Sequence, residues 1–190
     1  MKISHLICLA FLIAVGGCSK SGPPMTTKSY PLGERGTLVL AFPADWKDAL
    51  PRIREVATNM TLTFDAIQFQ PATGSNWSIL IQLVPLNETN IAKLDIKALA
   101  LERGQGLLAG AVETNPAVQE LKGVEAQGYY FDVTDRQWTN ASPPPGAVKY
   151  GMNGSARMGR LLLNFFVGTN DKDIEKQALD VISNARLTPP

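Results

Sequence analysis

Residues 147–169 read AVKYGMNGSARMGRLLLNFFVGT, and most of what we expect of the architecture rests on this stretch. Two runs of largely apolar and small side chains, 147–157 and 160–169, meet at a short connection around Met158 and Gly159. A short glycine-containing connection between two such runs is typical of a β-hairpin. We therefore predict two strands here, paired antiparallel.

Further strand-like runs lie on the N-terminal side of this hairpin. The run 37–42 is closed by Pro43, the run 61–69 alternates apolar side chains at its start, and the run 76–84 is more uniformly apolar. Residues 117–135 resemble a second hairpin that turns at Gly123. Period-two alternation and enrichment in β-branched and aromatic side chains favour strands. Hairpin-linked strands of this kind predict a largely antiparallel sheet.

Elsewhere the apolar period changes to that of a helix. A helix is predicted over roughly 91–109, where one stripe carries four apolar side chains: Leu94, Ala98, Leu101 and Leu108. Gly104 and Gly106 weaken its second half. A helical face is also possible over 44–60, although Pro51 interrupts it; that face would carry Trp46, Leu50, Ile53 and Val56.

The last predicted element is a helix over 171–184. Asn170 or Asp171 can cap it, and Asp173 and Glu175 lie in its first turn, where acids favour the helix dipole. Its core face would consist of Ile174, Ala178, Val181 and Ile182. Two amphipathic helices must cover the sheet, so the fold class expected is α+β, a twisted antiparallel sheet packed by helices.

The N-terminus predicts export. An apolar run over 6–15 follows Lys2 and ends at Gly16 and Gly17, as in a secretory signal. The run is shorter than the roughly 20 residues that span a bilayer. We predict that residues 1–17 are a signal peptide, residues 18–35 a flexible tether and residues 36–187 a single globular domain.

The end of this signal carries a more specific pattern. Val15-Gly16-Gly17-Cys18 resembles the bacterial lipobox. That resemblance implies cleavage between Gly17 and Cys18, a diacylglycerol thioether on Cys18 and acylation of its new amine, with palmitate as the expected acid. The domain would then face the periplasm. Ser19, where an Asp would favour retention, resembles an outer-membrane sorting signal, so we favour the outer over the inner membrane.

Composition excludes several classes of function. Without Lys2 the mature chain has 17 basic side chains (18 less Lys2) against 17 acidic ones, which argues against a nucleic-acid binder. The signal also removes His5 and Cys8, so no His and no free Cys remain for a catalytic triad or a zinc site. We predict no metal, no cofactor and no enzymatic activity, although a hydrolase using Ser-Lys or paired carboxylates stays formally open.

A resemblance to a family rests on residues 36–46, Gly36-Thr37-Leu38-Val39-Leu40-Ala41-Phe42-Pro43-Ala44-Asp45-Trp46. A first strand that ends in a Phe-Pro step and a short turn is similar to the opening of PsbP-like domains and of DcrB-like bacterial lipoproteins. The middle helix, the hairpin entry at 120–123, the paired strands and the closing helix follow the same order. The resemblance implies an α/β/α sandwich around an antiparallel sheet, and domains that act in binding or assembly without catalysis.

The leading hypothesis is a membrane-tethered, non-catalytic interaction module with a protein partner in the cell envelope. Its expected contact surface is the Pro-rich loop 136–146, represented by Trp138, Asn140 and Pro144. The alternative is a small-ligand or lipid-binding lipoprotein, which predicts an apolar cavity between sheet and helices with a few convergent polar groups.

Overall fold

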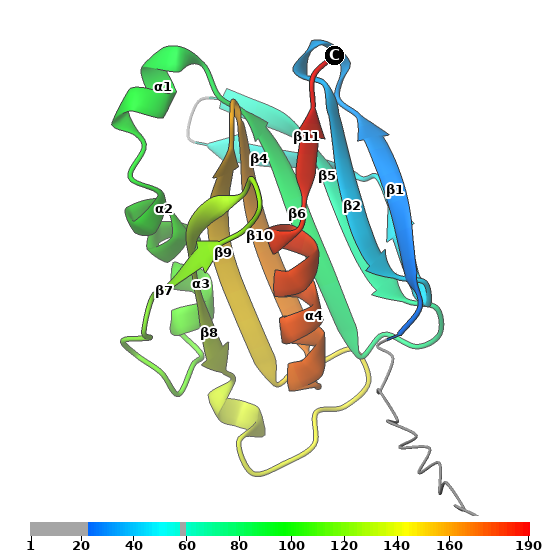
Figure 1. Cartoon of the computed structure of the whole chain (residues 1–190). Coiled ribbons are helices and arrows are strands. Elements are labelled where there is room, and N and C mark those ends of the chain that lie inside the picture. Colours follow the sequence, from blue (N-terminus) through cyan, green and yellow to red (C-terminus); the bar gives the residue numbers. More distant parts are fainter. Residues whose placement is uncertain (1–22, 58–59) are drawn as a thin grey trace, which may run out of the picture.

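The computed structural model describes residues 23–57 and 60–190 (Figure 1). Its centre is an eight-stranded sheet in the order β3-β5-β6-β10-β9-β8-β7, with β4 paired to β5, and every pairing in it is antiparallel. The strands are β3 (Trp46–Ala49), β4 (Arg52–Ala57), β5 (Met60–Pro71), β6 (Trp77–Pro85), β7 (Gln119–Lys122), β8 (Gln127–Thr134), β9 (Tyr150–Met158) and β10 (Leu161–Thr169).

The predicted hairpin of residues 147–169 is confirmed and lies inside the sheet. β9 and β10 pair from Leu161↔Met158 to Thr169↔Tyr150, and β10 also pairs with β6. Gly154 lies where a Cβ would overlap the ring of Phe165, so only glycine lets these two strands pack at this point. Both faces of β10 are buried, which explains why its sequence is nearly continuous in apolar residues.

One face of the sheet is covered by α4 (Lys172–Ser183) and by a small antiparallel sheet, β1-β2-β11 (Figure 1). The small sheet consists of β1 (Met25–Pro31), β2 (Thr37–Pro43) and β11 (Arg186–Thr188). The main core cluster lies between these layers and the large sheet, and it includes Leu38, Leu40, Ile81, Phe165 and Ile182, all at most 1 % exposed. The closing helix is confirmed, and Asp171 is its cap, since its carboxylate accepts from the Asp173 amide at 2.9 Å.

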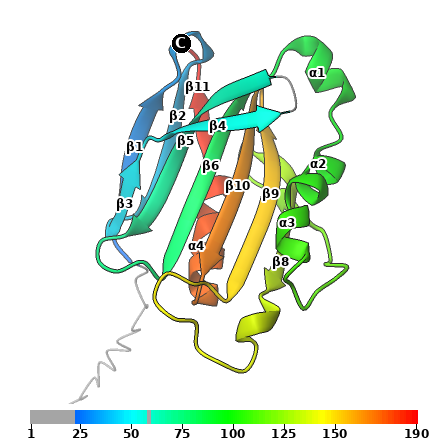
Figure 2. The same ribbon diagram turned by 180° about the vertical axis from the view of Figure 1, so that it is seen from behind.

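Three short helices follow β6: α1 (Glu88–Lys93), α2 (Ile96–Arg103) and α3 (Gln105–Leu108). On the opposite face of the sheet, α2 packs against β8 and β9, and α3 packs against β8 (Figure 2). The prediction of one continuous helix over 91–109 is therefore wrong. Asp95 caps a new helix by accepting from the Ala98 amide, and at Gly104 the chain turns against the ring of Phe131, which a Cβ would overlap.

The predicted tether is also wrong from residue 25 onward. β1 pairs antiparallel with β2 over its whole length, and Tyr30 is only 2 % exposed in the main core. A short 3₁₀ turn over Gly33–Arg35 connects the two strands. Because β1 is an edge strand with mostly polar, exposed residues, its sequence resembles a linker although its backbone is paired.

Residues 44–60 contain strands where a helical face was possible. β3 pairs with the end of β5 and β4 with its beginning. Trp46 packs its ring 4.8 Å from that of Trp77 and 5.7 Å from that of Phe69. These long-range aromatic contacts, together with Pro51, favour the extended chain over a helix.

The strand ends define two poles of the molecule. The N-terminal pole gathers the ends that meet in the pairs Met25↔Pro43, Trp46↔Pro71, Thr169↔Trp77 and Thr134↔Tyr150. The C-terminal pole gathers the ends that meet in Pro31↔Thr37, Leu161↔Pro85 and Thr188↔Thr37. In Figure 1 the loop before β9 and the start of β1 lie at the lower end, and the C-terminus lies at the upper end.

Candidate functional site

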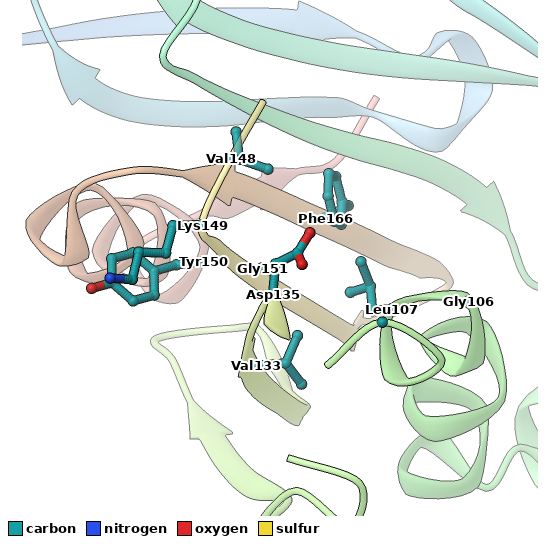
Figure 3. Close-up of a pocket in the computed structure, with 10 residues that line it drawn as sticks. Gly106, Leu107, Val133, Asp135, Val148, Lys149, Tyr150, Gly151 and Phe166 are labelled. Atoms are coloured by element: carbon teal, nitrogen blue, oxygen red, sulfur yellow. The ribbon is translucent and has the colours of Figure 1, made fainter. Parts of the chain in front are cut away.

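A hollow of about 160 Å³, here called the α3 hollow, lies at the N-terminal pole between α3 and the ends of β8, β9 and β10 (Figure 3). Its apolar floor is formed by Leu107, Val133 and Phe166. The hollow is open because Gly106 and Gly110 have no side chain and nothing lies within 4 Å of where a Cβ would stand. The local glycine content of this helical segment therefore shapes the site.

Two charged side chains border the α3 hollow, and both are used to hold the neighbouring loop. The Asp135 carboxylate accepts from the Gln137 amide at 2.8 Å and caps the 3₁₀ turn of Arg136–Trp138. The Lys149 ammonium donates to the Thr139 carbonyl at 3.2 Å. Figure 3 shows the Lys149 side chain extending away from Leu107 and Phe166. Asp135 and Lys149 are the charged side chains of this lining, and both are bonded to the loop that follows β8.

A second, polar hollow of about 130 Å³ adjoins the first at Phe166. In it Gln82 Oε1 accepts from the Arg103 guanidinium at 2.7 Å and from Asn164 Nδ2 at 3.4 Å. Ser155 Oγ donates to Asn164 Oδ1 at 2.8 Å. Gln82, Ser155 and Asn164 are at least 93 % buried, and their hydrogen bonds to one another make this cluster part of the sheet's structure.

A larger hollow, about 620 Å³, lies at the C-terminal pole and is here called the distal hollow. Its lining combines two arginines, Arg35 and Arg160, and one acid, Glu34, with the apolar side chains of Leu161 and Leu187. The guanidinium groups lie 3.9 Å from the carboxylates of Asp65 and Glu88 respectively, and all four charged side chains are well exposed. Such exposed pairs are weak, so both arginines remain able to meet an anionic group.

Another polar cluster lies between α4 and β8, beside a hollow of about 350 Å³. The Lys172 ammonium pairs with Glu175 at 2.7 Å and with Asp132 at 3.2 Å, and lies 4.5 Å above the Tyr150 ring. Glu175 is 5 % exposed, and its Oε1 accepts no hydrogen bond. Burial raises the pKa of Glu175 although the ion pair with Lys172 opposes the rise.

Burial of Glu175 was missed by the sequence analysis, which placed it in the first turn as a dipole partner. The available signal was its position three residues before Ala178 and seven before Ile182, which puts all three on one stripe of α4. Ile174, expected in the core, is only partly buried. The carboxylate is stabilised in this position by Lys172, which follows the cap by one residue.

The predicted contact loop is held in place by several hydrogen bonds. Arg136 donates from its amide to the Gly110 carbonyl at 2.9 Å and from its guanidinium to the Ala111 carbonyl at 2.7 Å. Within the loop Trp138 is half-buried, while Asn140 and Pro144 are exposed. The three residues lie on one connection at the N-terminal pole, next to the α3 hollow.

The lipidation residue Cys18 and the cleavage residue Gly17 lie outside the described residues. Within residues 23–57 and 60–190, no three His, Cys, Asp or Glu side chains are grouped so that they could hold a metal ion. In the same part of the chain no helix is long and apolar enough to cross a membrane.

The sequence matches no family model and no curated protein. The fold, however, matches a solved structure, the solution structure of cyanobacterial PsbP (CyanoP) from Synechocystis sp. PCC 6803. The superposition covers 92 % of this chain and 99 % of that one, with a TM-score of 0.52 and 11 % sequence identity.

The chain therefore has a PsbP-like fold, α+β with a large antiparallel sheet and helices packed against it. This confirms the fold class and the PsbP-like resemblance predicted from residues 36–46 and the order of elements. At 11 % identity the match speaks for the fold alone.

Proposed function

We propose that this protein is a bacterial lipoprotein, anchored through a lipid on Cys18 and facing the periplasm, whose PsbP-like domain is a non-catalytic protein-interaction module of the cell envelope. The observation that carries the proposal is the position of β1. Its first residue, Met25, follows the lipobox cysteine by only seven positions, so a folded domain starts directly behind the predicted anchor. Ser19 favours the outer membrane.

The non-catalytic character is supported by how the described polar groups are used. Asp135 caps a turn, Gln82 and Asn164 bond to each other, and Lys172 is paired with two carboxylates. A Ser-Lys hydrolase needs a lysine that is free to take a proton from a serine. The pKa of Lys172 is raised, because its bonds to Glu175 and Asp132 outweigh burial, and this is opposite to the shift that such a base needs.

Metabolic labelling with an alkyne analogue of palmitate tests the anchor. The full-length protein should incorporate the label and float with membranes. Cys18→Ser should abolish both, whereas Cys8→Ser, a matched control within the predicted signal, should leave both unchanged. Labelling that survives Cys18→Ser would overturn the proposed site.

In-cell crosslinking followed by pull-down of the tagged full-length protein tests the interaction module. We expect one set of envelope proteins to be recovered with the anchored chain and largely lost with Cys18→Ser. Correct membrane localisation without any specific crosslinked protein would contradict the interaction module while leaving the anchor intact.

The distal hollow favours a second candidate function, binding of a small anionic ligand. Its volume of about 620 Å³ falls within the roughly 300–1,000 Å³ of ligand pockets, and its arginines and leucines suit an amphiphilic anion. Native mass spectrometry of the protein released from membranes would show an added mass in this case. That mass should disappear in the double variant Arg35→Ser/Arg160→Ser.

A further inference from the structure

We propose that the N-terminal pole rests on the membrane and that the surface of loop 136–146, with Trp138, contacts the lipid headgroups. This inference rests on the proposed lipidation of Cys18. It assigns the predicted contact loop to a lipid surface, and it leaves the C-terminal pole, with the distal hollow, as the end presented to the periplasm.

The reach of the chain between anchor and domain limits how the domain can sit. Seven residue steps separate Cys18 from Met25, and even fully extended they span at most about 25 Å. A flexible chain of this length has an end-to-end distance of only about 15 Å. β10, with nine residues, is itself about 26 Å long. At its relaxed length the tether is clearly shorter than the domain, so turning the C-terminal pole toward the membrane would require the tether to stretch fully and run back along the whole domain.

Hydrogen bonds and a ring contact connect the point where the tether enters to the predicted contact loop. The Ala44 amide donates to the Pro24 carbonyl at 2.8 Å, which places the chain entry at the turn before Trp46. Trp46 packs on Trp77. Beside Trp77, the Asn76 carbonyl accepts from the Asn170 amide at 3.2 Å, and Asn170 Nδ2 donates to the Ala147 carbonyl at 3.0 Å. The tether entry and the loop before β9 therefore belong to one continuous end of the molecule.

The two long loops of this end have a composition that suits a lipid headgroup layer. Residues 71–78, PATGSNWS, and 139–148, TNASPPPGAV, contain no charged side chain. Met25, at the same pole, exposes 56 % of its surface, and Val112, which bonds to the end of β8, exposes 47 %. Tryptophan, which has an apolar ring and a polar N–H, is favoured at the membrane interface. Trp138 lies directly before the second of these loops.

The pole has no excess of positive charge, so the contact should be apolar and polar but not electrostatic. The side chains of Lys47, Arg136 and Lys149 donate to backbone carbonyls of Ala72, Ala111 and Thr139. Lys172, in the first turn of α4, adds a fourth cation. Five acids lie at the same end: Asp45, Glu113, which accepts from the Thr134 amide, Asp135, Asp171 and Asp173. A pole without excess positive charge gains little from anionic lipids.

Fluorescence quenching by spin-labelled lipid headgroups tests this orientation. Because the lipidated chain carries no cysteine thiol, a single new cysteine can be labelled with an environment-sensitive dye in the full-length protein, purified with its lipid and reconstituted in phosphatidylcholine vesicles. The near positions are Asn140→Cys and Ser75→Cys. The matched distant positions are Val124→Cys, in the turn between β7 and β8, and Glu102→Cys, on α2; all four are exposed.

We expect headgroup quenching at 140 and 75 to exceed that at 124 and 102 several-fold, with all variants floating equally with the vesicles. Equal quenching at all four positions, or the strongest quenching at 124 or 102, would overturn the orientation while the lipid anchor stands. A chain that is not lipidated and does not float would overturn the proposed function and this inference together. Adding phosphatidylglycerol should leave the pattern unchanged, and a several-fold gain would contradict a neutral contact surface.

Discussion

Asp48 shows how one side chain connects the two sheets. Its carboxylate accepts from the Lys28 ammonium at 2.7 Å and from the Tyr30 hydroxyl at 3.0 Å, so β3 is bonded to β1. The carboxyl group is only 15 % exposed. Burial alone would raise the pKa of Asp48, but the hydrogen bonds from Lys28 and Tyr30 outweigh it and the pKa is lowered. The pKa of the Tyr30 hydroxyl is raised, first by its own burial and then by its hydrogen bond to the Asp48 carboxylate.

Asp48→Asn should lower the free energy of unfolding at pH 7 by about 1 kcal/mol, because a charged acceptor of two hydrogen bonds is lost. A lowered pKa in the folded state stabilises the fold above the unfolded pKa, and this contribution disappears as the pH falls through the folded pKa. Urea unfolding at pH 7 and pH 3 measures the effect. The difference between wild type and variant should shrink at pH 3, and an equal difference at both values would contradict the assignment.

Glu175 should show the opposite pH dependence. Because its folded-state pKa is raised, the folded protein favours the protonated carboxyl, and stability is lost as the pH rises from the unfolded pKa through the folded one. We expect Glu175→Gln to gain stability relative to wild type between pH 4 and pH 7. The control is Asp173→Asn, an exposed acid of the same helix turn, which shows whether removing any negative charge from this turn has the same effect. If the stability difference between Glu175→Gln and wild type does not change with pH, burial does not penalise the charged form of Glu175.

At the scale of elements, short segments depend on partners that are distant in sequence. β1 buries one side chain, that of Tyr30, and it is held by β2 and by Asp48 of β3. α2 and α3 are likewise too short to be stable alone, and they remain helical by packing Leu101, Leu107 and Leu108 on Phe131 and Val133.

Truncation tests whether residues 25–31 act as a stabilising strand or as a flexible linker. A chain starting at Pro24 should melt like the domain of the longer chain, whereas a chain starting at Gly36 should lose at least about 3 kcal/mol, the cost of removing a buried aromatic side chain. Thermal unfolding followed by circular dichroism measures both. Equal melting temperatures would mean that residues 25–31 behave as a tether after all.

Two glycines of the helical segment make a matched pair. Gly104→Ala should destabilise by about 1–3 kcal/mol, since the new Cβ would overlap the Phe131 ring. Gly106→Ala, in α3 with open space around it, should be neutral or stabilising because alanine favours helix. Chemical unfolding of both variants tests the packing. A loss of similar size in the two would indicate a backbone requirement in place of the ring contact.

At the scale of the whole molecule, the two poles differ in chemistry. Uncharged loops and the first strand's beginning lie at one end, while a hollow with two arginines lies at the other. This asymmetry follows from antiparallel pairing, which brings residues from all parts of the chain to the same end, such as Met25, Trp77, Trp138 and Tyr150. If the domain is anchored through Cys18 as proposed, the asymmetry separates a membrane side from a side presented to the periplasm.

The sequence by itself predicted the elements whose signal is local: the hairpin of β9 and β10, the strand after Gly36, the hairpin around Gly123 and the closing helix, with Asn170 or Asp171 as its cap. It also predicted the α+β class and, through Gly17 and Cys18, an anchor that stays a prediction. Local periodicity suffices there because each of these elements has a continuous apolar stripe.

Only the tertiary structure decided the rest. β1 has no apolar pattern of its own, and it is a strand because β2 pairs with its backbone and Asp48 bonds to two of its side chains. Residues 46–49 and 52–57 are strands that pair with β5, and Trp46 packs on Trp77. Glu175 is buried because Lys172 pairs with it, and the loop of Trp138 shares a pole with Met25 because the strands run antiparallel. In each case the stabilising partner is supplied by the fold and is not visible in the local pattern, so period and composition alone could not predict it.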